Sequence, residues 1–170
     1  MIMEQITDYI TGQEIDNVGA EASRQIFEKF LVETKGYAKE DIRVDVPLTV
    51  QFKGEDYPSA IDLVVCAGDR PVMAVTCVAG SIGSYEREII AGARLVYDAQ
   101  IPLAVSTDGR DAVVLDTLTG KPRGKGLDAV PSKQAAAKLM DTHENTPLDP
   151  AKRPGEMIIY RSFNLEKVNK

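Results

Sequence analysis

The sequence predicts one mixed α/β domain in which helices flank a central sheet. Two near-continuous apolar runs of strand length, residues 61–66 and 72–78, indicate buried strands, and amphipathic stretches with helical period lie before and after them. A chain of 170 residues with 44% apolar residues is in the size range of one domain with its own core. We therefore expect a single domain over residues 1–170, of which residues 133–170 form a C-terminal extension.

The first third of the chain predicts one helix and one edge strand. Apolar residues at helical spacing favour a helix over residues 20–35, and residues 6–10 before it indicate a short helix or turn. From residue 42 to residue 52 apolar side chains alternate, which predicts a strand, and Pro47 favours an edge position for it. Residues 54–59 are then expected to form a turn.

The middle of the chain predicts the centre of the sheet. The runs 61–66 and 72–78 are joined by a tight loop and are expected to be adjacent strands. A helix is expected over residues 84–99, because acidic residues occupy its first turn and apolar residues recur on one face. Strands over 103–106 and 112–115 follow, so this helix connects strands as in a crossover unit.

The last third of the chain has weaker patterns. Residues 120–126 are rich in glycine and lysine and predict a mobile basic loop, and residues 132–140 predict a modest helix. An exposed loop is expected over residues 141–156. The apolar run 157–160 favours a final edge strand.

Composition indicates a cytoplasmic protein with no membrane segment. The two cysteines, Cys66 and Cys77, lie inside apolar runs, as reduced packing residues do, and we expect them on opposite faces of the sheet with no disulfide. No leader is evident, and no apolar run approaches the roughly 20 residues of a membrane helix. The net charge of −6 disfavours nucleic acid unless the basic groups gather on one face.

Asp62 is the first candidate for a functional residue, because it interrupts an otherwise apolar strand. A buried carboxylate without a partner costs several kcal/mol, so Asp62 is expected to meet a basic residue, backbone donors or a metal ion. Both a structural ion pair and a metal position fit the local pattern. Strand alternation places its side chain on the face of Val64 and Cys66.

The next strand lacks the charged groups that metal-dependent cleavage of phosphodiesters requires. That chemistry uses clustered carboxylates for Mg²⁺ and commonly a lysine near the attacking water. Neither face of the strand over 72–78 carries a charge, and Thr76 is its only polar residue. A hydroxyl is a poor substitute for a carboxylate ligand.

Three motifs in order carry a resemblance to a known family. They are Glu21-Ala-Ser-Arg-Gln25, the strand Ser59-Ala-Ile-Asp62-Leu-Val-Val, and Thr107-Asp-Gly109, with the strand over 72–78 between the last two. In this arrangement the chain resembles the N-terminal domain of type I restriction enzyme R subunits, a member of the PD-(D/E)XK nuclease superfamily. The similarity runs from about residue 21 to residue 132. It implies a restriction-endonuclease-like fold, with a mixed central sheet flanked by helices.

Carried over by residue, the resemblance assigns a degenerate site. Glu21 matches the family's helical glutamate and Asp62 its metal-binding aspartate. The family's Glu-X-Lys pair falls on Thr76 and Val78, or on Ala74 and Thr76, so either register removes both catalytic groups. The resemblance thus leaves Asp62, Glu21 and Thr76 as vestigial catalytic positions, the first two forming a weak metal site. Glu21 also lies opposite the apolar stripe of its helix, so a merely solvated side chain is an alternative.

Basic residues give a candidate nucleic-acid surface. Arg87 and Arg94 are seven residues apart on the predicted helix and share a face, although Arg94 could instead pair with Asp98. The basic loop over 120–126 has no phosphate-loop spacing. Its contributions to the candidate surface are Lys121, Arg123 and Lys125.

Two functions follow as hypotheses. The first is a catalytically inactive nuclease-fold domain, retained for binding nucleic acid or a protein partner, with no cofactor or weakly bound Mg²⁺. The second is an active Mg²⁺-dependent DNA endonuclease in which Asp62 and Glu21 are joined by a residue that has migrated, such as Glu86 or Glu88. The first is favoured on sequence, because the strand pattern persists while the Glu-X-Lys pair is missing.

Overall fold

The computed structural model describes residues 4–168, and its centre is a six-stranded mixed sheet. The strands follow one another across the sheet in sequence order, and only β5 and β6 are parallel. This sheet is composed of β3 (Ile42–Phe52), β4 (Glu55–Ala67), β5 (Arg70–Cys77), β6 (Leu103–Thr107), β7 (Ala112–Asp116) and β8 (Pro122–Lys125).

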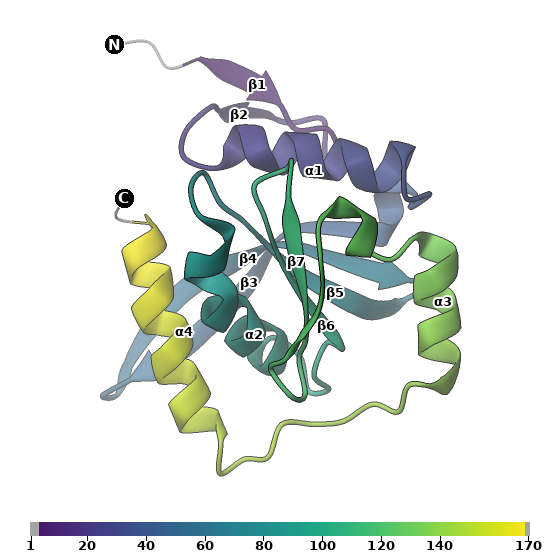
Figure 1. Cartoon of the computed structure of the whole chain (residues 1–170). Coiled ribbons are helices and arrows are strands. Elements are labelled where there is room, and N and C mark those ends of the chain that lie inside the picture. Colours follow the sequence, from purple (N-terminus) through teal and green to yellow (C-terminus); the bar gives the residue numbers. More distant parts are fainter. Residues whose placement is uncertain (1–3, 169–170) are drawn as a thin grey trace.

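Helices cover both faces of the sheet (Figure 1). On one face, α1 (Glu21–Glu33) and α3 (Lys133–Thr142) contribute Phe27, Leu31 and Met140 to a core with the sheet. On the other face, α2 (Glu86–Leu95) and α4 (Arg153–Val168) contribute Ile89, Ala93 and Tyr160 to a second core. The six-stranded mixed sheet between two helical layers is a restriction-endonuclease-like fold, as the sequence predicts.

The centre of the sheet confirms the predicted strands. The run 61–66 lies in β4 and the run 72–78, except for its last residue, lies in β5, and the two strands pair antiparallel with Leu63 opposite Val75. The chain then passes through α2 to β6, which lies parallel to β5, so the expected crossover is present. Because both faces of these strands are covered by helices, their side chains are apolar without alternation.

The segments around the first helix differ from the prediction in two places. Residues 6–10 do not form a helix but enter a small hairpin of β1 (Gln5–Thr7) and β2 (Glu14–Asp16), whose turn is closed by the Asp8 carboxylate accepting from Thr11 N–H. The expected turn over 54–59 is wrong because Lys53 and Gly54 alone make the turn, both with positive φ, and β4 begins at Glu55. Two central residues with positive φ are typical of tight hairpins.

The later segments also need correction. The helix expected over 84–99 is shorter, since α2 ends at Leu95 and follows a single 3₁₀ turn over Ile82–Tyr85. The basic segment 120–126 is not a mobile loop, because Pro122–Lys125 within it form β8 at the sheet edge. Two further 3₁₀ turns lie at Lys39–Asp41 and Leu127–Ala129.

The C-terminal segment is the largest difference from the prediction. Neither a loop to residue 156 nor an edge strand over 157–160 is present, because α4 occupies Arg153–Val168. Its two fully buried side chains are Tyr160 and Asn164. The inward face of α4 mixes the apolar Met157 and Tyr160 with polar groups, so its apolar stripe is interrupted and is harder to recognise in a sequence.

The two cysteines lie where the alternation predicts. Cys66 packs in the core under α2 and α4, and Cys77 packs in the core under α1 and α3, so they face opposite sides of the sheet. Both thiols are free and buried. No helix within residues 4–168 has the length and apolar character to cross a membrane.

Candidate active site

A pocket of about 520 Å³ opens at the C-terminal end of β5. Its walls come from the start of α1, the middle of β4, the loop after β5 and the last turn of α4. Three charged side chains line it: Glu21, Asp62 and Lys167. The structure thus brings together the two carboxylates that the sequence singled out, and adds a lysine from the C-terminal helix.

Asp62 has both a backbone donor and a basic side chain as partners, as was expected for a carboxylate on this strand. Its Oδ2 accepts a hydrogen bond from the backbone N–H of Cys77 at 2.7 Å, which ties β4 to the end of β5. The Lys167 ammonium lies 4.0 Å from the same oxygen. With its side chain 26% exposed, Asp62 still faces the pocket.

Beside Asp62, three residues from three elements form one polar cluster. The Lys167 ammonium donates to Thr76 Oγ1 at 2.8 Å and to Glu88 Oε1 at 2.9 Å, and Thr76 Oγ1 donates to the same Glu88 oxygen at 3.1 Å. Glu88 comes from α2, Thr76 from β5 and Lys167 from α4. The Glu88 carboxylate and the Lys167 ammonium therefore both bond to Thr76. This residue occupies one of the β5 positions that were expected to carry a glutamate or a lysine.

The second oxygen of Glu88 is also satisfied. Asn164 Nδ2 donates to Glu88 Oε2 at 3.1 Å, and the Tyr57 hydroxyl donates to Asn164 Oδ1 at 2.5 Å. Only 2% of Glu88 is exposed, so its charge depends on these partners. Such a fully bonded buried network holds its members in one arrangement.

Lys167 keeps its proton in this setting. Burial disfavours the ammonium, but the attraction of Asp62 and Glu88 outweighs burial and raises the pKa of Lys167. The side chain is therefore a hydrogen-bond donor and a fixed positive charge near neutral pH. It is not a proton acceptor.

Glu21 is not a freely solvated side chain. It begins α1, lines the pocket, and pairs with Arg24 Nη2 at 2.7 Å. Burial raises its pKa, while the neighbouring Arg24 opposes that rise and Asp62 adds to it. The sequence alternative of a solvated glutamate is thus incorrect, although the metal role of Glu21 is not tested by its position.

Behind Glu21, Arg24 belongs to a buried cluster that contains Asp8 and Glu28. The Glu28 side chain is fully buried, and this burial, together with the hydrogen bond and charge of Asp8, raises the pKa of Glu28 to about 8. Burial would also raise the pKa of Asp8, but hydrogen bonds from Gln25 and Thr11 bring it below its usual value. At neutral pH Glu28 is therefore the protonated member.

The raised pKa of Glu28 predicts a pH dependence of stability. Between about pH 4.5 and about pH 8 the folded state holds a proton that the unfolded state has lost, so stability falls as pH rises through this window. Glu28→Gln imitates the neutral acid and should remove that part of the fall. Urea unfolding of both proteins across the window is expected to show the variant gaining on the order of a few kcal/mol over wild type. Parallel pH profiles would contradict this assignment.

The basic candidates are not gathered at the pocket. Arg94 does not pair with Asp98 but donates to Glu156 at 2.6 Å and to the Thr117 carbonyl at 2.9 Å, so it is committed to joining α2 and α4. Arg87 is exposed. The remaining candidates, Lys121, Arg123 and Lys125, lie on or next to β8, which β6 and β7 separate from β5.

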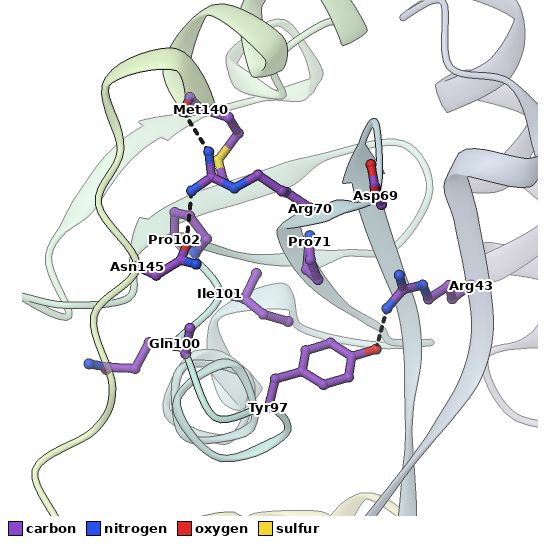
Figure 2. A pocket seen from close by; sticks show the side chains of 11 residues that line it. Arg43, Asp69, Arg70, Pro71, Tyr97, Gln100, Ile101, Pro102, Met140 and Asn145 are labelled. Atoms are coloured by element: carbon purple, nitrogen blue, oxygen red, sulfur yellow. Dashed lines mark hydrogen bonds between the residues drawn. The ribbon is translucent and has the colours of Figure 1, made fainter.

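A second cavity, of about 330 Å³, lies at the opposite end of β5 (Figure 2). Arg70 lines this cavity and donates hydrogen bonds to the carbonyls of Met140 and His143 and to the Asn145 side chain. It therefore joins the end of α3 to the segment that follows that helix. Arg43 donates to the Tyr97 hydroxyl. These contacts are structural, and the carboxylate and lysine chemistry lies in the first pocket.

Sequence reasoning included Glu88 among the migrated candidates but missed Lys167. Glu88 was visible because it follows β5 closely and interrupts an amphipathic helix. Lys167 lies 91 residues from Thr76 in the sequence, beyond the last element that the sequence predicts. Its spacing from Glu156, Tyr160 and Asn164 at one helical face was the available signal.

Comparison with known proteins agrees with the fold. The family model described as type I restriction enzyme R protein N terminus matches residues 19–131, more than half of the chain. The chain belongs to this family. No curated protein and no solved structure matches it significantly. The matched residues include Glu21, Asp62 and Glu88, whereas α4 and Lys167 lie outside them.

Proposed function

We propose that the protein is a cytoplasmic, Mg²⁺-dependent DNA endonuclease domain in which Glu88 and Lys167 replace the absent Glu-X-Lys pair. The observation that carries this proposal is the convergence of Glu88 and Lys167 on Thr76, next to Asp62 and at the edge of an open pocket. Buried charges in apolar surroundings are costly to retain, and clusters of them beside a cleft are typical of functional sites. This proposal reverses the ranking that the sequence favours.

The residues at the pocket fit a magnesium ion that binds together with its substrate. Mg²⁺ keeps several water ligands and is commonly held by one or two carboxylates plus substrate phosphates. Asp62 and Glu21 are the two carboxylates that line the pocket. Within residues 4–168 no three acidic, histidine or cysteine side chains are grouped closely enough to hold a metal by themselves. Binding of Mg²⁺ without DNA is therefore expected to be weak.

The chain's own residues have separate roles in this proposal. Bound Mg²⁺ would supply the positive charge that stabilises the pentavalent phosphate and lowers the pKa of the attacking water. Lys167 donates hydrogen bonds and offsets charge on the phosphate, because it stays protonated. Glu88 holds the Lys167 ammonium in place through a 2.9 Å contact. The oxygen of the attacking water bonds to phosphorus and gives up a proton to solvent as the ester P–O bond breaks, and the leaving oxygen takes up a proton from solvent.

Plasmid cleavage tests this proposal. Purified wild-type protein is expected to nick or linearise supercoiled plasmid in Mg²⁺ and not in excess chelator. Asp62→Asn should reduce cleavage below detection, because it removes the carboxylate that faces both the pocket and Lys167. The matched control is Asp69→Asn, which changes an exposed aspartate in the turn after the same strand. Equal cleavage by wild type and Asp62→Asn would rule out this site as the source.

The second candidate is a catalytically inactive domain that binds nucleic acid or a protein partner. One observation favours it: the Lys167 ammonium already lies beside Asp62 and Glu88, where it balances both charges without a metal. This alternative predicts DNA binding in a gel-shift assay with no cleavage at any Mg²⁺ concentration. It also predicts that Asp62→Asn changes stability without changing DNA binding.

A further inference from the structure

Arg24 is surrounded by four acidic side chains, two from α1, one from β3 and one from the turn of the β1–β2 hairpin. Its guanidinium lies 2.7 Å from Glu21, 3.0 Å from Asp45 and 3.7 Å from Asp8, and its Nε lies 3.7 Å from Glu28. Only 3% of Arg24 is exposed. An arginine in this position is fixed in orientation, because its planar fork is restrained from several directions.

Two of these carboxylates anchor Arg24 from outside α1. Asp45 belongs to β3 and has a positive φ of 53°, a left-handed conformation that costs energy for a residue with a side chain. Asp8 belongs to the turn of the β1–β2 hairpin, where it accepts hydrogen bonds from Gln25 Nε2 and Thr11 N–H. The N-terminal hairpin and the edge strand therefore both fix the guanidinium.

Glu21 is the only one of the four acidic side chains that lines the pocket. It makes the shortest of the four contacts, from one helical turn before Arg24. Arg24 thus restrains the Glu21 carboxylate at the edge of the pocket.

We infer that Arg24 is a positioning residue that presents Glu21 to the divalent cation in the pocket. This inference rests on the proposed function for the metal, and it adds a role for the β1–β2 hairpin, which precedes the matched residues 19–131. Arg24 touches neither substrate nor metal. It acts through Glu21, held in place by Asp8 and Asp45.

The affinity of the full chain for Mn²⁺, measured by calorimetry, separates positioning from a simple charge effect. Loss of a residue that orients a metal ligand typically weakens metal affinity about 10- to 100-fold. Removing a nearby positive charge without any positioning role would instead tighten Mn²⁺ binding. Arg24→Gln is therefore expected to weaken it, whereas tighter or unchanged binding would overturn the inference. In a Glu21→Gln background, Arg24→Gln should cause little additional loss, because both act through one side chain.

A second variant keeps the test decisive if Arg24→Gln folds poorly. Asp45→Asn removes one anchor of Arg24 through a side chain that is 62% exposed, and it should weaken Mn²⁺ binding in the same direction. If wild type neither binds Mn²⁺ nor cuts DNA, the proposed function fails. If wild type binds Mn²⁺ and neither variant weakens that binding, the role of Arg24 is overturned separately.

Discussion

Replacing Lys167 with glutamine is expected to abolish Mg²⁺-dependent cleavage and to destabilise the fold. The substitution removes the charge that lies within 2.9 Å of Glu88 and 4.0 Å of Asp62. Loss of one preorganised donor at a developing negative charge commonly lowers turnover about 100- to 1,000-fold. Breaking a buried ion pair by removing one partner costs roughly 3 to 5 kcal/mol, which urea unfolding will measure. Cleavage rates are then compared at a temperature where the variant is folded.

The matched control is Arg161→Gln on the same helix. Arg161 lies over the rings of Phe52 and Tyr57, so its loss removes a cation from α4 that reaches Glu88 only indirectly, through Tyr57 and Asn164. It is expected to cleave plasmid at close to the wild-type rate. A folded Lys167→Gln protein that cuts as fast as Arg161→Gln would show that Lys167 has no part in the chemistry.

Replacing Glu88 with glutamine is expected to have the second largest effect. Glutamine keeps the shape of the side chain and one oxygen acceptor, but it removes the charge that holds Lys167. Because burial disfavours the ammonium and Glu88 is one of the groups that offset burial, the pKa of Lys167 should fall. Cleavage should fall about 100-fold or more.

The pH dependence of the residual cleavage rate of Glu88→Gln shows whether Glu88 acts by keeping Lys167 charged or whether the substitution simply disrupts the fold. If Lys167 loses its proton more easily in Glu88→Gln, the rate of the variant should decline at a lower pH than the wild-type rate does. Glu86→Gln is the control, since Glu86 is the neighbouring glutamate on α2 and does not line the pocket. An unchanged profile in Glu88→Gln would mean that Glu88 does not hold Lys167 in its charged form.

The fold and half of the site could be predicted from the sequence because they depend on local patterns. The strands over 61–66 and 72–78 are apolar on both faces. This pattern is typical of strands in a sheet with helices packed on each of its two faces. Alternation along these strands correctly placed the two cysteines on opposite faces of the sheet. The resemblance added Glu21, which the structure places at the same pocket.

The other half of the site depends on the packing of α4, which local patterns do not reveal. Its inward face carries Glu156, Tyr160, Asn164 and Lys167, and their partners lie on α2, β4 and β5. An apolar stripe identifies an amphipathic helix, but polar groups that bond to distant elements give no such stripe. The resemblance therefore predicted the lysine on β5, whereas Lys167 comes from the last turn of α4.

The most direct test of the relocated pair is a rescue experiment that moves the carboxylate back to the strand. Thr76 Oγ1 lies 3.1 Å from Glu88 Oε1, so a glutamate at position 76 in the Glu88→Gln background would place its charge near the same ammonium. Single-turnover plasmid cleavage is measured for wild type, Glu88→Gln and Thr76→Glu/Glu88→Gln. We expect cleavage by wild type, its loss in Glu88→Gln, and a substantial part of the wild-type rate in the double variant. Full cleavage by Glu88→Gln, or no Mg²⁺-dependent cleavage by wild type, would contradict the relocation of the catalytic pair.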